Sequence, residues 1–150
     1  MKWTSNKKMR ANERALVELF SKIDEQYEGL LIVVEGKRDE KILRELGVKA
    51  RIVKTQSGKP RLEFLEEIAS AAGEGGQVLI LTDFDPEGVD LCRFVERDLE
   101  LRKIVVLGRI RREIRKLMGN WRCIEEMVSL FKRRDSPDPL DPRQDWQAHE

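Results

Sequence analysis

The chain has 150 residues, of which 40% are hydrophobic and 38% charged, and its formal net charge is only +1. This length and apolar content suit one α/β domain, and the near-neutral charge means that only a local cluster of charges could indicate a nucleic-acid partner. Neither Cys92 nor Cys123 belongs to a Cys-x-x-Cys pair, so we expect two reduced thiols and no zinc site. The single histidine is His149, next to the C-terminus, and histidine-based catalysis is not expected. The sequence shows no signal peptide and no apolar run of membrane-spanning length, which predicts a cytoplasmic protein with no membrane partner.

Apolar residues recur at helical spacing from Met9 to Tyr27 and predict an amphipathic helix with Tyr27 in the core. Short apolar strands then alternate with amphipathic helices. We expect strands at 30–34, 50–53, 78–81 and 103–107, and helices at 38–46, from Pro60 to Ala72 with Leu62 on the buried stripe, and from Pro86 to Leu99. This alternation predicts an α/β, Rossmann-like fold: a central parallel sheet of about four strands with helices on both faces.

The pattern divides the chain into four segments. An N-terminal helical extension (1–29) precedes the α/β core (30–107), and basic helices (108–134) are expected to pack on that core. In this third segment Asn120 is a plausible N-cap for a last helix, whose apolar stripe runs from Trp121 to Phe131. The remaining residues, 135–150, are rich in acids and proline and predict a flexible tail.

Acidic side chains follow two of the predicted buried strands. Glu35 comes directly after the first strand, and Asp83 and Asp85 follow the third. Ligands of open α/β sheets bind at the carboxyl ends of the strands, so we expect these three carboxylates to meet at one edge. Residues i and i+2 of an extended segment point the same way, which lets both aspartates face the site while Phe84 turns into the core.

Three carboxylates in one place repel each other unless a cation lies between them. Mg²⁺ (or Mn²⁺) is a hard cation that takes carboxylate oxygens, and it could stabilise charge on a phosphate. Gly36 and Gly88 would let the backbone approach such a phosphate closely. One alternative remains open at this point, because Asp85 could cap the helix that begins at Pro86 and bind no ion.

The segments LIVVEGKRD (31–39) and VLILTDFDPEG (78–88) together resemble the Toprim domain. That domain is shared by type IA topoisomerases, DnaG-type primases, OLD-family nucleases and ribosomal RNA maturation nucleases. The resemblance covers roughly residues 30–107, which would then be a Toprim core. The Glu-Gly-Lys segment is most similar to the small nuclease-type members.

The resemblance implies a role for each matching residue. Glu35 would act as general acid or base or help to hold metal, and Asp83 and Asp85 would bind Mg²⁺. Glu87 matches a further acid of the topoisomerases and would support the metal. Lys37 would touch a phosphate, and Asp39 would support the site.

Two classes of Toprim enzyme and two other families with an acidic strand end fit this sequence less well. Type IA topoisomerases need a catalytic tyrosine in a separate large domain, and primases need a zinc-binding domain. We expect neither domain here, so neither topoisomerase nor primase activity is expected. Haloacid dehalogenase-like phosphatases have threonine where this chain has Glu87, and receiver domains need an acidic pair where only Glu35 stands. A Toprim-type protein remains the preferred interpretation.

Basic residues cluster after the last predicted strand. Residues 102–122 contain eight lysines and arginines against one acid, Glu113. Such a cluster gains affinity for phosphates by releasing counterions, although a solvated helix face paired with the acidic tail explains it as well. The residues expected to bind nucleic acid are Lys59, Arg109, Arg111, Arg112, Arg115 and Lys116, with a second cluster at Lys132, Arg133 and Arg134. Trp3 and Trp146 could stack on bases, whereas Trp121 is expected in the core.

Two functions follow from these features. The first is a Mg²⁺-dependent nuclease that acts on RNA or DNA. The alternative is a non-catalytic module that binds nucleic acid or a larger nucleic-acid-processing complex and uses the acidic site only for docking.

Overall fold

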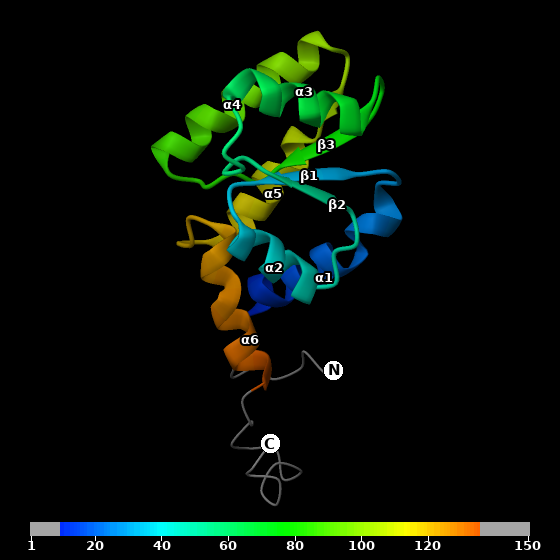
Figure 1. Cartoon of the computed structure of the whole chain (residues 1–150). Coiled ribbons are helices and arrows are strands. Elements are labelled where there is room, and N and C mark those ends of the chain that lie inside the picture. The colour runs from blue at the N-terminus through cyan, green and yellow to red at the C-terminus, as the bar shows by residue number, and fades with distance from the viewer. Residues whose placement is uncertain (1–9, 136–150) are drawn as a thin grey trace, which may run out of the picture.

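The structure, a computed structural model, describes residues 10–135 (Figure 1). Trp3, Trp146, His149 and the expected flexible tail lie outside these residues, as do the side chains of the 132–134 cluster. In chain order the elements are α1 (Ala11–Gln26), β1 (Leu31–Val34), α2 (Lys37–Glu45), β2 (Arg51–Lys54), α3 (Arg61–Ala72), β3 (Gln77–Ile80), α4 (Pro86–Leu101), β4 (Val105–Val106), α5 (Gly108–Met118), a 3₁₀ turn η1 (Ile124–Met127) and α6 (Val128–Asp135). Within residues 10–135, no helix is both long and apolar enough to cross a lipid bilayer.

The strands form one sheet in the order β2-β1-β3-β4, and every pair is parallel. Leu31 of β1 lies opposite Arg51 on one side and Val78 on the other, which places β1 and β3 at the centre. All four residues of β1 are buried, as continuous apolar runs are in sheets covered on both faces. The predicted α/β fold with a parallel sheet of four strands is therefore confirmed.

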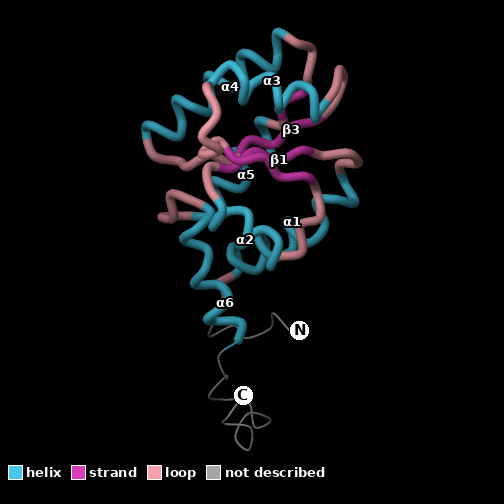
Figure 2. Tube along the Cα trace, viewed as in Figure 1, coloured by secondary structure: helices cyan, strands magenta, loops and turns pink. Residues whose placement is uncertain are grey.

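Helices cover the sheet in two layers (Figures 1 and 2). α3 and α4 lie together on one face, and α1, α2, α5 and α6 lie on the other. Side chains alternate accordingly, since Leu31 and Val33 pack in the core under α3 and α4, whereas Ile32 and Val34 pack in the core beneath the opposite layer. Tyr27 and Trp121 are partly buried against this second core.

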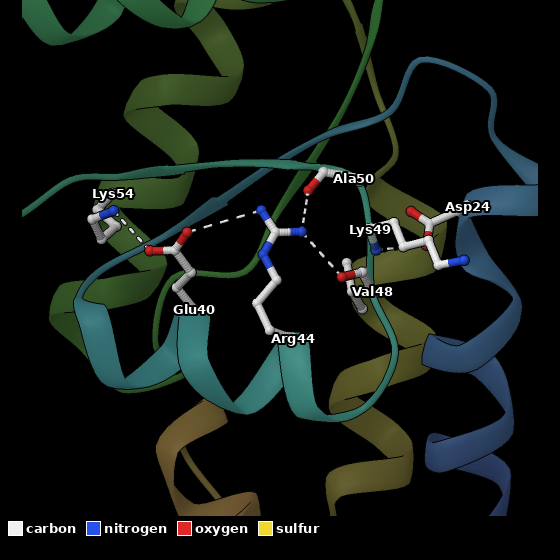
Figure 3. A network of polar contacts seen from close by, with 7 residues as sticks. All are labelled: Asp24, Glu40, Arg44, Val48, Lys49, Ala50 and Lys54. Atoms are coloured by element: carbon white, nitrogen blue, oxygen red, sulfur yellow. Dashed lines mark hydrogen bonds and ion pairs between the residues drawn. The ribbon is translucent and has the colours of Figure 1, made fainter.

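A polar network fastens α2 to the edge strand β2 (Figure 3). Arg44 donates hydrogen bonds from Nη1 to the carbonyl oxygens of Val48 and Ala50, at 3.0 and 2.7 Å. Lys54 at the end of β2 pairs with Glu40 of α2 at 2.8 Å. These contacts hold the strand beside β1, and so fix the loop that follows it near the site.

The structure corrects two details of the first half of the prediction. Leu62 is 67% exposed instead of buried, because Phe64 joins Leu65 and Ile68 on the inner face of α3 and turns Leu62 away from it. The last strand has two residues instead of the five expected at 103–107. Its first residues are taken up in the turn that leaves α4, where the Ile104 N–H bonds to Leu99 O at 3.0 Å.

The C-terminal segment also differs from the prediction. Asn120 does not cap a helix, and no single helix runs from Trp121 to Phe131. Instead Cys123 is the N-cap of the 3₁₀ turn that leads into α6. The reason lies in Glu126, whose carboxylate accepts hydrogen bonds from the backbone N–H groups of Arg122 and Cys123 and so starts the turn three residues later.

Candidate carboxylate site at the sheet edge

Glu35 and Asp83 meet at the carboxyl edge of the sheet. β1 and β3 are neighbours in register, so the residues that follow them emerge side by side. Glu35 Oε2 accepts a hydrogen bond from the backbone N–H of Asp83 at 2.9 Å. A side-chain-to-backbone hydrogen bond thus joins two residues that the sequence separates by almost fifty positions.

Crowding changes the acidity of these groups. Burial raises the pKa of Asp83 to about 7, with further increases from the nearby Glu35, Asp39 and Asp85 carboxylates. Burial also raises the pKa of Glu35, and Asp85, Asp39 and Glu87 add to this effect, while the hydrogen bond from Asp83 opposes it. Near neutral pH the site therefore resists holding all of its negative charges at once, which is the condition that a bound cation relieves.

Asp85 has a structural contact of its own. Its Oδ1 accepts a hydrogen bond from Gly88 N at 2.7 Å and caps α4, so the cap foreseen as an alternative is present. Its charge still raises the pKa of both Glu35 and Asp83. A metal-binding role for Asp85 stays a prediction, as does that of Glu87, which is exposed in the first turn of α4.

Gly88 and Gly36 both make contacts within the protein, and their approach to a phosphate stays a prediction. A Cβ on Gly88 would lie 2.1 Å from the backbone oxygen of Asp83, so only glycine lets α4 start this close to the loop. The buried Thr82 hydroxyl donates to Gly88 O at 2.8 Å and fixes the same contact. Gly36 is the N-cap of α2, and its N–H donates to Asp39 Oδ2 at 3.0 Å.

A cavity of about 450 Å³ opens beside Glu35 and Asp83. The sequence predicts that Gly36, Lys37 and Asp39 lie near the site, and these residues line the cavity. The lining residues that the sequence did not predict are Arg38, Gln56, Cys123 and Glu125. Gln56 could have been foreseen because it follows β2, the neighbour of β1, whereas Cys123 and Glu125 come from the η1 segment by tertiary packing alone.

One of the predicted nucleic-acid-binding residues supports the floor of the site. Arg111 of α5 is half-buried and donates hydrogen bonds to the carbonyl oxygens of Ile80, Thr82 and Asp83, at 2.8, 3.0 and 3.3 Å. Its guanidinium also lies over the Phe84 ring, 4.3 Å from the centroid. Arg111 therefore satisfies carbonyl groups that extend past the last strand pairing, and its burial lowers its pKa.

The other predicted nucleic-acid-binding residues lie nearer to solvent. Arg109, Arg112 and Lys116 are exposed on α5. Arg115 is exposed as well, but its Nη1 donates to Gly119 O at 2.9 Å and closes the end of the helix. Lys59 pairs with Glu67 at 3.0 Å.

The carboxylates do not form a ready-made cage. Within the described part of the chain, no three His, Cys, Asp or Glu side chains are grouped so that they could hold an ion as they lie. The structure does provide the hydrogen bond from the Asp83 N–H to the Glu35 carboxylate, and the charges of Glu35, Asp83 and Asp85 are close enough to influence one another.

Comparison with known proteins gives relatives of similar length. The chain is 40% identical to a UPF0292 protein of Thermococcus onnurineus over 121 residues, which cover 80% of this chain and 86% of the relative. A UPF0292 protein of Methanocaldococcus jannaschii is 32% identical over 129 residues, or 84% of this chain and 98% of that one. No protein-family model matches the chain. A solved structure from Aquifex aeolicus superposes with a TM-score of 0.60 at 22% identity, covering 75% of this chain and 95% of its own, and so supports the α/β fold.

Proposed function

The chain belongs to the UPF0292 family, whose name states no activity, and we propose from the site that it is a Toprim-like, Mg²⁺-dependent nuclease. One observation carries this proposal. Glu35 touches Asp83 at the carboxyl edge of a parallel sheet, where burial and neighbouring carboxylates raise the pKa of both. Sites of this kind, with perturbed acids in a cavity at a sheet edge, are where catalysis is found in α/β proteins.

The donor set fits Mg²⁺ or Mn²⁺. Mg²⁺ usually keeps several waters and is held by one or two carboxylates together with substrate phosphates, so a complete protein cage is not needed. Glu35 and Asp83 would supply those carboxylates, with Asp85 and Glu87 in support. When bound, the ion would supply positive charge to a phosphodiester and to the oxygens that attack and leave.

The residues of the chain supply the rest of the chemistry. Burial raises the pKa of Glu35 above that of an ordinary carboxyl group, which makes it a better proton acceptor, as a general acid or base requires. Lys37 brings positive charge to the cavity wall, where it would meet a phosphate that flanks the scissile one. Arg38 is paired there with Glu125 at 3.0 Å, so its charge is already offset by a carboxylate. Asp39 holds the Gly36 N–H and keeps the β1–α2 loop in place.

The nucleic acid would also meet exposed positive charge on α5. Arg109, Arg112 and Lys116 have no role in the site itself and are available for phosphates. Such a nuclease would act on RNA or DNA in the cytoplasm, alone or within a larger nucleic-acid-processing complex.

The test is incubation of the full chain with Mg²⁺ or Mn²⁺ and with structured RNA, single-stranded RNA, single-stranded DNA and duplex DNA. The variants are Glu35→Gln, Asp83→Asn and Asp85→Asn, the last because asparagine keeps the α4 cap while removing the charge. We expect metal-dependent cleavage that falls about 100-fold or more in Glu35→Gln and Asp83→Asn.

Glu74→Gln is the matched control, because Glu74 is exposed in the loop before β3, at the opposite edge of the sheet. It should cleave as the wild type does. Binding of nucleic acid without cleavage in either metal would overturn the nuclease and leave the non-catalytic module.

A further inference from the structure

A second hollow lies on the other side of Glu35. It has a volume of about 330 Å³ and is bordered by α3 and α4, which lie side by side on one face of the sheet (Figure 1). Glu35 lines both this hollow and the cavity that contains Asp83. The hollow is thus continuous with the proposed catalytic carboxylate, and a ligand that fills one would lie next to the other.

The walls of this hollow combine an aromatic ring with a cation. Phe94 of α4 is 37% exposed, and it is the only aromatic among the large hydrophobic side chains that the described part of the chain exposes. Arg61 at the start of α3 lies over that ring, with Cζ 4.6 Å from the centroid. None of the ion pairs within residues 10–131 includes Arg61, so its guanidinium makes no direct contact with a carboxylate.

The remaining lining residues decide what kind of ligand fits. Glu35, Glu87 and Asp90 add carboxylates to the hollow, and these would repel a phosphate group. The same carboxylates accept hydrogen bonds from N–H donors, and the amino and imino groups of nucleobases are such donors. A flat π system would pack on the Phe94–Arg61 pair, as unpaired bases pack on aromatic rings and guanidinium planes.

We propose that this hollow is a subsite for one unpaired nucleobase next to the scissile phosphate. The proposal rests on the proposed function for its substrate class and deepens it to single-stranded nucleic acid. A base that enters the hollow must leave its helical stack, so paired strands are poor ligands. Phe94 and Arg61 are then residues that position the strand and select for its unpaired state.

The first experiment measures binding without cleavage. The full chain is titrated in EDTA into single-stranded oligonucleotides that carry 2-aminopurine, whose fluorescence falls when it stacks on a ring. Phe94→Leu keeps the apolar volume and removes the ring, and Phe94→Tyr restores a ring. We expect Phe94→Leu to bind at least about 5-fold more weakly and to lose the quenching, and Phe94→Tyr to retain both.

Leu101→Ala is the matched control, because Leu101 is an exposed apolar residue at the far end of the same helix. It should bind as the wild type does. Thermal unfolding of each variant verifies that the fold is intact.

An abasic substrate separates base recognition from general loss of affinity. Removing the base at the quenched position should weaken wild-type binding as much as Phe94→Leu does, and the variant should show no further loss on that substrate. Additive losses, or equal affinity of wild type and Phe94→Leu for every strand, would overturn the subsite.

This result does not depend on cleavage. Base-dependent quenching without cleavage would refute the nuclease and support the subsite. Cleavage at the same rate in Phe94→Leu and wild type would support the nuclease and refute the subsite. Tight binding of a divalent cation in the hollow, competing with the oligonucleotide, would also overturn the base subsite.

Discussion

Replacing Asp83 by asparagine should stabilise the metal-free protein, and more so at high pH. The folded protein keeps a proton on Asp83 up to about pH 7, whereas the unfolded chain releases it near 3.8. Between these values the folded state binds more protons, so the free energy of unfolding falls as the pH rises from about 4 to about 7. Asparagine has nearly the same shape and no charge, and the variant therefore lacks this fall.

The size of the effect follows from the difference between the two pKa values. A rise from 3.8 to about 7 corresponds to about 4 kcal/mol at full strength, and because half-buried Asp83 is partly screened by water we expect about 1–2 kcal/mol. Urea unfolding in EDTA, followed by circular dichroism at about pH 4 and about pH 8, measures it. The stability difference between Asp83→Asn and wild type should grow by this amount across the interval.

Mg²⁺ should make the wild type more stable to unfolding than Asp83→Asn, the opposite of the order expected in EDTA. An ion that binds the folded wild type stabilises it by about 2.7 kcal/mol at a hundredfold excess over its Kd, and the variant should gain much less. Glu74→Gln, which removes a carboxylate at the opposite edge of the sheet, should respond to neither pH nor metal in this way. If the difference in the free energy of unfolding between Asp83→Asn and wild type were the same at both pH values, the pKa of Asp83 would not be raised in solution. That result would refute the crowding of carboxylates at this site.

Three further predictions concern the frame of the site. Gly88→Ala should destabilise the protein by about 1–3 kcal/mol in urea unfolding, because its Cβ meets rigid backbone at 2.1 Å, whereas Gly108→Ala meets only the ends of side chains and should cost much less. Arg111→Lys should lower the melting temperature, since a single ammonium cannot reach three carbonyl oxygens with the geometry of a guanidinium. An unchanged melting temperature would show that the three hydrogen bonds of Arg111 do not stabilise the fold. A thiol reagent should label Cys123, which lines the cavity, well before the buried Cys92, and peptide mass spectrometry would detect the reverse order.

The part of the site that lies on strand ends could be predicted from the sequence. Glu35 and Asp83 follow apolar runs that have few alternatives to a buried parallel strand, and parallel strands bring their carboxyl ends together. The cavity wall formed by Cys123 and Glu125 could not be predicted in this way. Those residues reach the site only because a short 3₁₀ turn replaces the expected helix, and a capping contact of Glu126 decides that turn.

The arginines, too, show what local sequence predicts and what only tertiary packing decides. Local sequence shows that residues 102–122 are basic, but it does not show which guanidinium turns inward. Arg111 does so because backbone carbonyls at the end of β3 need donors and the Phe84 ring offers a surface. Arg109 and Arg112, two positions and one position away on the chain, remain exposed. Tertiary contacts therefore decide which arginine of α5 is half-buried.

The contacts of Arg111 limit how far the chain can be truncated. The loop that carries Asp83 receives donors from α5 through this guanidinium, and the Phe84 N–H donates to Arg122 O at 2.6 Å. A fragment trimmed to residues 30–107 would leave these carbonyls and this amide without partners, so its acidic loop would lose its shape even if the sheet survived. Any minimal version of the protein must retain α5 and the segment that follows it as far as Arg122.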